Sequence, residues 1–66
     1  MITINGEKHP LKQDIVLLSL LEQMCGTKLE GVAAAINGAL IPRSSWSKTK
    51  IEAGDDVEIV QATSGG

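Results

Sequence analysis

The stretch that decides the fold is Val-Glu-Ile-Val-Gln-Ala at residues 57–62, near the end of a sequence of 66 residues. Its alternation of apolar and polar side chains is typical of a half-buried β-strand. A turn at residues 53–56 precedes it, and no adjacent segment reads as a strand that could pair with it. We therefore expect this last strand to pair with a strand that is distant in the sequence.

The first residues of the sequence supply that partner. Residues 1–4 alternate in the same way, and Asn5-Gly6 follows them as a strong signal for a two-residue hairpin turn. The return strand is predicted at residues 7–12, and Pro10, which has no N–H, restricts it to an edge of the sheet. A long crossover allows the first and last strands to lie parallel and side by side.

A helix is predicted at residues 15–24, after this hairpin. Its apolar residues recur at helical spacing, although the β-branched Ile15 and Val16 would also suit a strand. Asp14 can cap the N-terminus of the helix, and Gly26 can end it.

A second hairpin follows the helix. Strands are predicted at residues 32–36 and 39–41, joined by another Asn-Gly turn at residues 37–38. Residues 43–50 read as a polar connection that carries Trp46, the only aromatic residue of the sequence. The order is therefore β-β-α-β-β-β, and we expect an α+β fold in which a mixed sheet grips one helix.

Alternation assigns the residues of the expected sheet to two faces, one covering the helix and one meeting solvent. The face toward the helix would carry Ile2, Ile4, Val57 and Ile59. The open face presents small apolar residues that would form a shallow docking patch beside the C-terminal residues, and an acidic residue there could steer a basic partner surface. The residues assigned to this hypothetical docking surface are Ala33, Ala35, Glu58, Val60 and Ala62.

Length and charge restrict the possible functions. Sixty-six residues form one small domain with little room for a cleft that encloses a substrate, which favours a binding or carrier module over a self-contained enzyme. The net charge of -2, with both signs interspersed, and the single aromatic residue give no support to nucleic-acid binding. No feature of the sequence requires an oligomer, so we expect a monomer when the protein is free of partners.

The expected location is a reducing cytoplasm. Cys25 is the only cysteine, so neither an intrachain disulfide nor a cysteine metal cluster is expected. The sequence starts with a strand pattern rather than with the charged and apolar regions of a signal peptide. The longest apolar run, residues 15–21, is too short to span a bilayer and is interrupted by Ser19, so no membrane association is expected.

The sequence closes on Gly65-Gly66, directly behind the last predicted strand. Glycine has no Cβ, so such a tail is slim and flexible, leaves its last carbonyl uncovered, and can thread into a narrow active site of another protein. We expect residues 1–62 to form the domain and residues 63–66 to form this flexible tail. A frayed terminus or a cloning remnant is the alternative interpretation.

Four other residues have both a structural and a functional interpretation. Cys25 is expected to be a small buried apolar residue rather than a persulfide relay, and His9 a solvated edge-strand residue without a metal-ligating companion. Trp46 is expected to cover one end of the core, with contact to a partner as the alternative. Arg43 is expected to tie down a loop, with binding to an acidic partner patch as the alternative.

Four segments carry a family resemblance through their order and spacing. They are MITINGE at residues 1–7, AING at residues 35–38, IPRSSW at residues 41–46 and GDDVEIV at residues 54–60, followed by the Gly-Gly end. Together they resemble the sulfur carrier family of thiamine biosynthesis (ThiS), which has the β-grasp, or ubiquitin-like, fold. The match covers nearly the whole sequence; one departure is the Thr-Ser pair before Gly-Gly, which is more polar than the family's commoner residues.

The resemblance implies a carrier that partner enzymes act on, and not a catalyst. A ubiquitin-activating-like enzyme would adenylate the carboxylate of Gly66 with ATP, while Thr63, Ser64 and Gly65 thread into its active site. A sulfur donor enzyme, through a persulfide, would then displace AMP and leave a C-terminal thiocarboxylate. Thiazole synthase would use that sulfur to build the thiazole ring of thiamine. The resemblance implies no cofactor and no metal bound by this chain itself, since ATP is used by the adenylating partner.

Three alternatives stay open at this point. The first is another sulfur carrier of the same fold, of the molybdopterin synthase small subunit type, although that family is usually longer and carries aromatic residues toward its tail. The second is a protein modifier that would join Gly66 to a lysine through an isopeptide bond. The third is a structural binding module whose terminus is inert.

Overall fold

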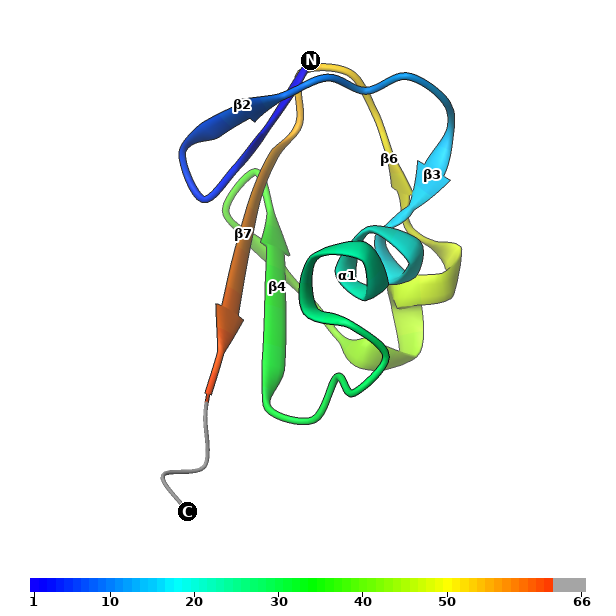
Figure 1. Ribbon diagram of the computed structural model, residues 1–66, viewed down its shortest axis with the longest axis vertical. Helices are drawn as coiled ribbons and strands as arrows, with labels where there is room; N and C mark the ends of the chain where they lie inside the picture. The colour runs from blue at the N-terminus through cyan, green and yellow to red at the C-terminus, as the bar shows by residue number, and fades with distance from the viewer. Residues whose placement is uncertain (63–66) are drawn as a thin grey trace.

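The computed structural model describes residues 1–62 of the chain. Five of its strands form one mixed sheet: β1 (Ile2–Ile4), β2 (Glu7–His9), β4 (Val32–Ile36), β5 (Ala39–Ile41) and β7 (Asp56–Gln61). Their order across the sheet is β2-β1-β7-β4-β5 (Figure 1). β7 runs parallel to β1, with Thr3 opposite Asp56 and Ile4 opposite Val57. The predicted pairing of the last strand with the first is therefore confirmed.

Two Asn-Gly turns build the hairpins, as the sequence predicts. Asn5 and Gly6 have φ of 51° and 85°, and Asn37 and Gly38 have φ of 52° and 84°, the positive values that a type I′ turn requires. β2 lies at an edge of the sheet, which confirms the prediction made from Pro10, but this strand is shorter than predicted. Pro10 has no N–H to offer β1, so the ladder stops before it.

The predicted start of the helix is wrong. α1 spans Leu17–Cys25, and the two residues before it form the short strand β3 (Ile15–Val16), which pairs antiparallel with β6 (Lys50–Ile51). β-branched side chains suit an extended ladder, and Ile15 lies opposite Ile51, a fully buried core residue. The competition between strand and helix at this apolar run is thus decided by a partner far away in the sequence.

The sequence prediction fails at the N-terminal end of α1 and is confirmed at its C-terminal end. The sequence predicts Asp14 as the cap of the helix, but this prediction is wrong: the cap position falls on Val16, where no described side chain caps the helix. The Asp14 carboxylate instead lies 3.6 Å from the ammonium group of Lys50, with both side chains exposed. At the other end, Gly26 stops the helix with φ of 81° and donates its N–H to the carbonyl of Glu22, as expected for a terminating glycine.

The segment predicted as a polar connection contains a 3₁₀ helix, η1 (Arg43–Lys48), and then β6. Trp46 lies on η1 and is buried, and its indole N–H donates to the carbonyl of Ile41 at 3.0 Å. Short 3₁₀ turns carry little periodic signal, and β6 is recognisable only through its partner β3, so sequence patterning does not reveal either element.

The core lies between the five-stranded sheet and α1. Figure 1 shows α1 between β4 on one side and the pair β3–β6 on the other. The predicted inward residues Ile2, Ile4 and Val57 are buried, and Ile59 is half-buried against the same cluster. Within residues 1–62, no helix is long and apolar enough to cross a membrane. The remaining buried core residues are Leu17, Leu20, Leu21, Ala34, Trp46 and Ile51.

Candidate functional site

The face of the sheet turned away from α1 presents small apolar side chains. Val60 of β7 lies directly opposite Ala33 of β4, and Glu58 lies opposite Ala35. Directly opposed residues of an antiparallel pair share a face of the sheet, whereas the intervening Ala34 points inward and is 2% exposed. Val60 is 64% exposed, so this face is open in the described structure.

Leu40 belongs to the same face, although alternation along β4 and β7 alone does not reveal it. It lies opposite Ala35 in the β4–β5 hairpin and is 72% exposed. The sequence does hold the signal, because a two-residue turn at residues 37–38 places residue 35 opposite residue 40. The apolar set of Ala33, Ala35, Leu40 and Val60, in which Ala35 is half-buried and the other three are exposed, is called the open-face patch below.

Acidic side chains border the open-face patch along β7. Glu58 is exposed next to Ala35. Asp56, two residues earlier and therefore on the same face, is exposed and accepts a hydrogen bond from the Thr3 hydroxyl at 2.7 Å. Lys8 lies opposite Thr3 on the outer strand β2. The face thus combines an apolar half with a mainly acidic half, which suits a partner that carries apolar and basic groups.

The two turn asparagines hold β7 from both sides. The Asn5 side chain accepts the N–H of Ile59 at 2.7 Å and donates to the carbonyl of Ile59 at 3.1 Å, as a neighbouring strand would. The Asn37 side chain accepts the N–H of Asp56 at 2.9 Å and donates to the Asp55 carboxylate at 3.1 Å. These contacts fix the strand that leads to the C-terminal residues.

β7 ends beside the start of β4. Gln61 lies opposite Val32, and beyond it the N–H of Ala62 donates to the carbonyl of Gly31 at 2.9 Å. Ala62 is exposed, as expected for a residue of the open face, and it is the last described residue. The expected tail residues Thr63, Ser64, Gly65 and Gly66 lie outside the described residues.

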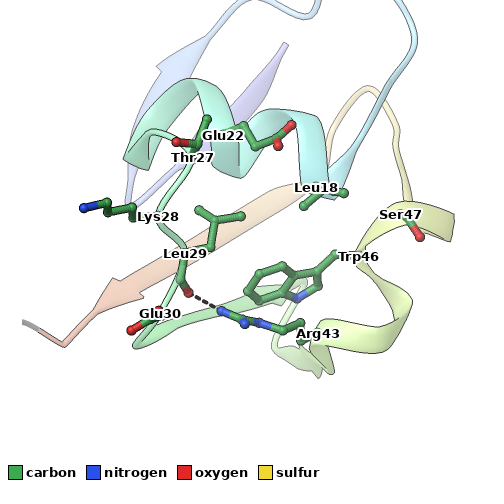
Figure 2. Close-up of a pocket in the computed structure, with 9 residues that line it drawn as sticks. All are labelled: Leu18, Glu22, Thr27, Lys28, Leu29, Glu30, Arg43, Trp46 and Ser47. Carbon is green, nitrogen blue, oxygen red and sulfur yellow. Dashed lines mark hydrogen bonds between the residues drawn. The ribbon is translucent and has the colours of Figure 1, made fainter.

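Arg43 and Trp46 form a second feature, an open pocket of about 500 Å³ between η1 and the loop after α1 (Figure 2). The guanidinium group lies 5.3 Å from the centre of the indole ring and donates to the carbonyl of Leu29, as Figure 2 shows. Arg43 therefore ties down the loop, and Trp46 is 2% exposed and fills one side of the core. Both contacts agree with the structural interpretations of these residues.

The remaining candidate residues stand apart from the open face. Cys25 is half-buried at the end of α1, and His9 is half-buried on the edge strand β2. Among residues 1–62, no group of three or more His, Cys, Asp or Glu side chains is placed to hold a metal ion. In that part of the chain, the candidate functional surface is thus the open-face patch together with the anchored end of β7.

Comparisons with known proteins agree on one family. The ThiS family model matches residues 2–66. The crystal structure of the thiamine biosynthesis protein ThiS from Geobacter metallireducens is similar to this chain with a TM-score of 0.80 and 25% identity, covering 98% of this chain and 97% of that one. An NMR solution structure of a thiamine biosynthesis protein from the same organism has the same TM-score and identity and covers 98% and 86%. A search of curated protein sequences gives no match.

Proposed function

The chain belongs to the ThiS family, and from this membership we propose that it is a sulfur carrier of thiamine biosynthesis. The observation that carries the proposal is the extent of the match, which runs from residue 2 through Gly66 and so includes both the fold and the Gly-Gly end. The β-grasp architecture, in which a mixed sheet grips one helix, supports the same assignment. The carrier would act in the cytoplasm as a substrate of partner enzymes.

The proposed reacting group is the carboxylate of Gly66. A terminal carboxylate has a pKa of about 3.5, so at neutral pH it is ionised and resists attack by nucleophiles. A ubiquitin-activating-like partner would join this carboxylate to the α-phosphate of ATP with release of pyrophosphate, which supplies a good leaving group. A persulfide on a sulfur donor enzyme would then attack the carbonyl carbon and expel AMP. Reduction of the resulting sulfur–sulfur bond by a thiol would leave the thiocarboxylate that thiazole synthase consumes.

The residues around this carboxylate suit threading into another protein. Gly65 and Gly66 have no Cβ, so the reacting carbonyl is open to attack and the adjacent backbone can enter a narrow channel. Thr63 and Ser64 have small side chains that add little width. We propose that these four residues enter the active site of the adenylating enzyme together.

The open-face patch is the proposed docking surface for that enzyme. Ala33, Ala35 and Val60, with Leu40 added, give an apolar surface that lies on the strands next to the end of β7. Exposed apolar clusters of this kind mark interaction sites in small soluble domains. Glu58 borders this surface on β7, and Ala62 continues it toward the proposed tail. Docking there would bring the carboxylate to the partner without using the helix side of the molecule.

A growth experiment tests the proposed function. In a bacterium that lacks its own ThiS-type carrier, the intact chain is expected to restore growth without added thiamine, and a chain without Gly66 is expected not to. The matched control is the substitution Gln61→Ala, which changes a residue near the C-terminus but leaves both glycines in place. This variant should restore growth. Equal growth with and without Gly66 would reject the carrier mechanism and favour a binding module with an inert terminus.

A further inference from the structure

Gly31 differs from the other glycines that have positive φ. Its φ is +77°, and a Cβ built on it would lie 2.7 Å from the carbonyl oxygen of Ala62, closer than real side chains approach. Four other described glycines also have positive φ, between +81° and +90°, yet a Cβ on any of them would meet nothing within 4 Å. Gly31 is therefore required for close backbone approach as well as for its conformation. The residue it approaches is the last one that the structure describes.

The loop that carries Gly31 is held on both sides. On one side, the Arg43 guanidinium donates to the carbonyl of Leu29, and the N–H of Val32 donates to the same carbonyl at 3.2 Å. On the other side, the carbonyl of Gly31 accepts the N–H of Ala62 at 2.9 Å. Figure 2 shows Arg43 reaching across the pocket to this loop. Ala62 is thus hydrogen-bonded to a loop that Arg43 in turn fixes to η1.

We propose that Gly31 is a positioning residue for the carrier reaction: its bare Cα and its carbonyl fix Ala62, and so set the point from which the tail leaves the domain. This inference rests on the proposed function. Four residues separate Ala62 from the end of the sequence, and an extended chain of four residues spans at most about 14 Å. When the open-face patch is docked, this short reach must bring the Gly66 carboxylate to the reacting phosphate.

The consequence of displacing Ala62 is a loss of rate rather than of binding. A misplacement of about 1 Å, even from a change far from the chemistry, can cost about a hundredfold in rate. The open-face patch includes neither Gly31 nor Ala62, which only borders it, so docking affinity should change little when only the position of Ala62 changes. A purely structural role of Gly31 would instead reduce the folded fraction and leave the turnover of the folded molecules unchanged.

The test compares the Gly31→Ala and Gly6→Ala variants as substrates for adenylation by the partner enzyme. The rate of adenylation is measured through the release of pyrophosphate. Both variants place alanine at positive φ, +77° and +85°, but only the first meets Ala62. For Gly31→Ala we expect kcat to fall at least about tenfold while KM for the carrier stays within about twofold, because the misplacement acts on the reacting geometry. For Gly6→Ala we expect both constants to stay within about twofold, because a Cβ at position 6 meets nothing within 4 Å and leaves Ala62 in place.

A second variant and a second readout keep the test decisive. Ala62→Pro removes the N–H that the Gly31 carbonyl accepts, without adding a Cβ at position 31, and should also lower kcat. It takes the place of Gly31→Ala in the test if that variant fails to fold. Hydrogen exchange at the Ala62 amide, which needs no partner enzyme, should accelerate in Gly31→Ala and not in Gly6→Ala. Equal kcat for Gly31→Ala and Gly6→Ala, with wild type active, would overturn this inference alone. A wild-type chain that the adenylating enzyme does not activate would overturn the proposed function and this inference with it.

Discussion

At the scale of single residues, two asparagines do more than form turns. A short polar side chain tolerates the left-handed conformation, which accounts for Asn at the first central position of both hairpins. The structure adds a second role, because both polar atoms of each side-chain amide form a hydrogen bond. Asn5 bonds to the backbone of Ile59 in β7, and Asn37 bonds to the N–H of Asp56 in β7 and to the Asp55 carboxylate just before it. The turns could be predicted from the Asn-Gly pairs, but the bonds to β7 could not, because they depend on which strand lies beside each turn.

The contribution of the Asn5 bonds can be measured with two substitutions. Asn5→Gly keeps the left-handed turn and removes both bonds to Ile59, so we expect the free energy of unfolding to fall by about 1–2 kcal/mol. Asn5→Ala should cost about 1 kcal/mol more, because alanine must also be held at positive φ. Urea denaturation of the two variants beside wild type gives both values. If Asn5→Gly proved as stable as wild type, the bonds to β7 would contribute nothing.

At the scale of elements, the sequence predicts those helices and strands that are marked by turn residues or by alternation, and it misses those that depend on a distant partner. The two hairpins, the terminating Gly26 and the parallel pairing of the first and last strands follow from turn residues and alternation, and the structure confirms them. β3, β6 and the true start of α1 could not be predicted, because Ile15 and Val16 suit both strand and helix. Only the proximity of Lys50 and Ile51 in the folded chain decides the matter.

The corrected helix start makes a specific prediction for Asp14. A capping carboxylate would be worth about 1 kcal/mol, whereas an exposed ion pair contributes about 0–1 kcal/mol and is screened by salt. Since Asp14 forms an exposed ion pair with Lys50 and does not cap α1, Asp14→Ala should change the free energy of unfolding by less than about 0.5 kcal/mol. The change should also be removed by about 1 M salt, where charges are screened within about 3 Å.

The complementary variant places a capping group where α1 actually begins. Val16→Thr keeps the β-branched shape that β3 needs and adds a hydroxyl at the uncapped position. We expect it to raise the free energy of unfolding by a few tenths of a kcal/mol up to about 1 kcal/mol. Thermal or urea denaturation of both variants checks the assignment. A loss of about 1 kcal/mol for Asp14→Ala at high salt would restore the original prediction of an Asp14 cap.

At the scale of the whole molecule, the two faces of the sheet have different tasks. One face buries the apolar residues that hold α1, and the other keeps Leu40 and Val60 exposed beside small alanines. Alternation along the strands was enough to assign Ala33, Ala35, Glu58, Val60 and Ala62 to the open face. Leu40 and the contact between Gly31 and Ala62 required the register of the pairing between strands, which the structure supplies.

The open-face patch is tested by placing a charge on it. Val60→Asp and Ala35→Asp should each weaken binding to the adenylating enzyme at least about tenfold, because a carboxylate buried in an apolar contact without a partner costs more than about 1.4 kcal/mol. Met24→Asp is the matched control: Met24 is 48% exposed on α1, away from the open face, and its substitution should leave binding unchanged. Calorimetric titration of the folded variants measures the affinities. Wild-type affinity for both open-face variants would eliminate the patch as the docking surface.

The central claim is that the carboxylate of Gly66 accepts sulfur, and the intact mass of the protein tests it most directly. The chain would be incubated with ATP, its adenylating enzyme and a persulfide generated from cysteine, beside a variant without Gly66. The proposal predicts a mass gain equal to the replacement of one oxygen by one sulfur in the intact chain, and no gain in the variant. An unchanged mass with a partner enzyme that is active on another carrier would contradict it, and so would a covalent adduct with a lysine-bearing protein in place of the sulfur gain.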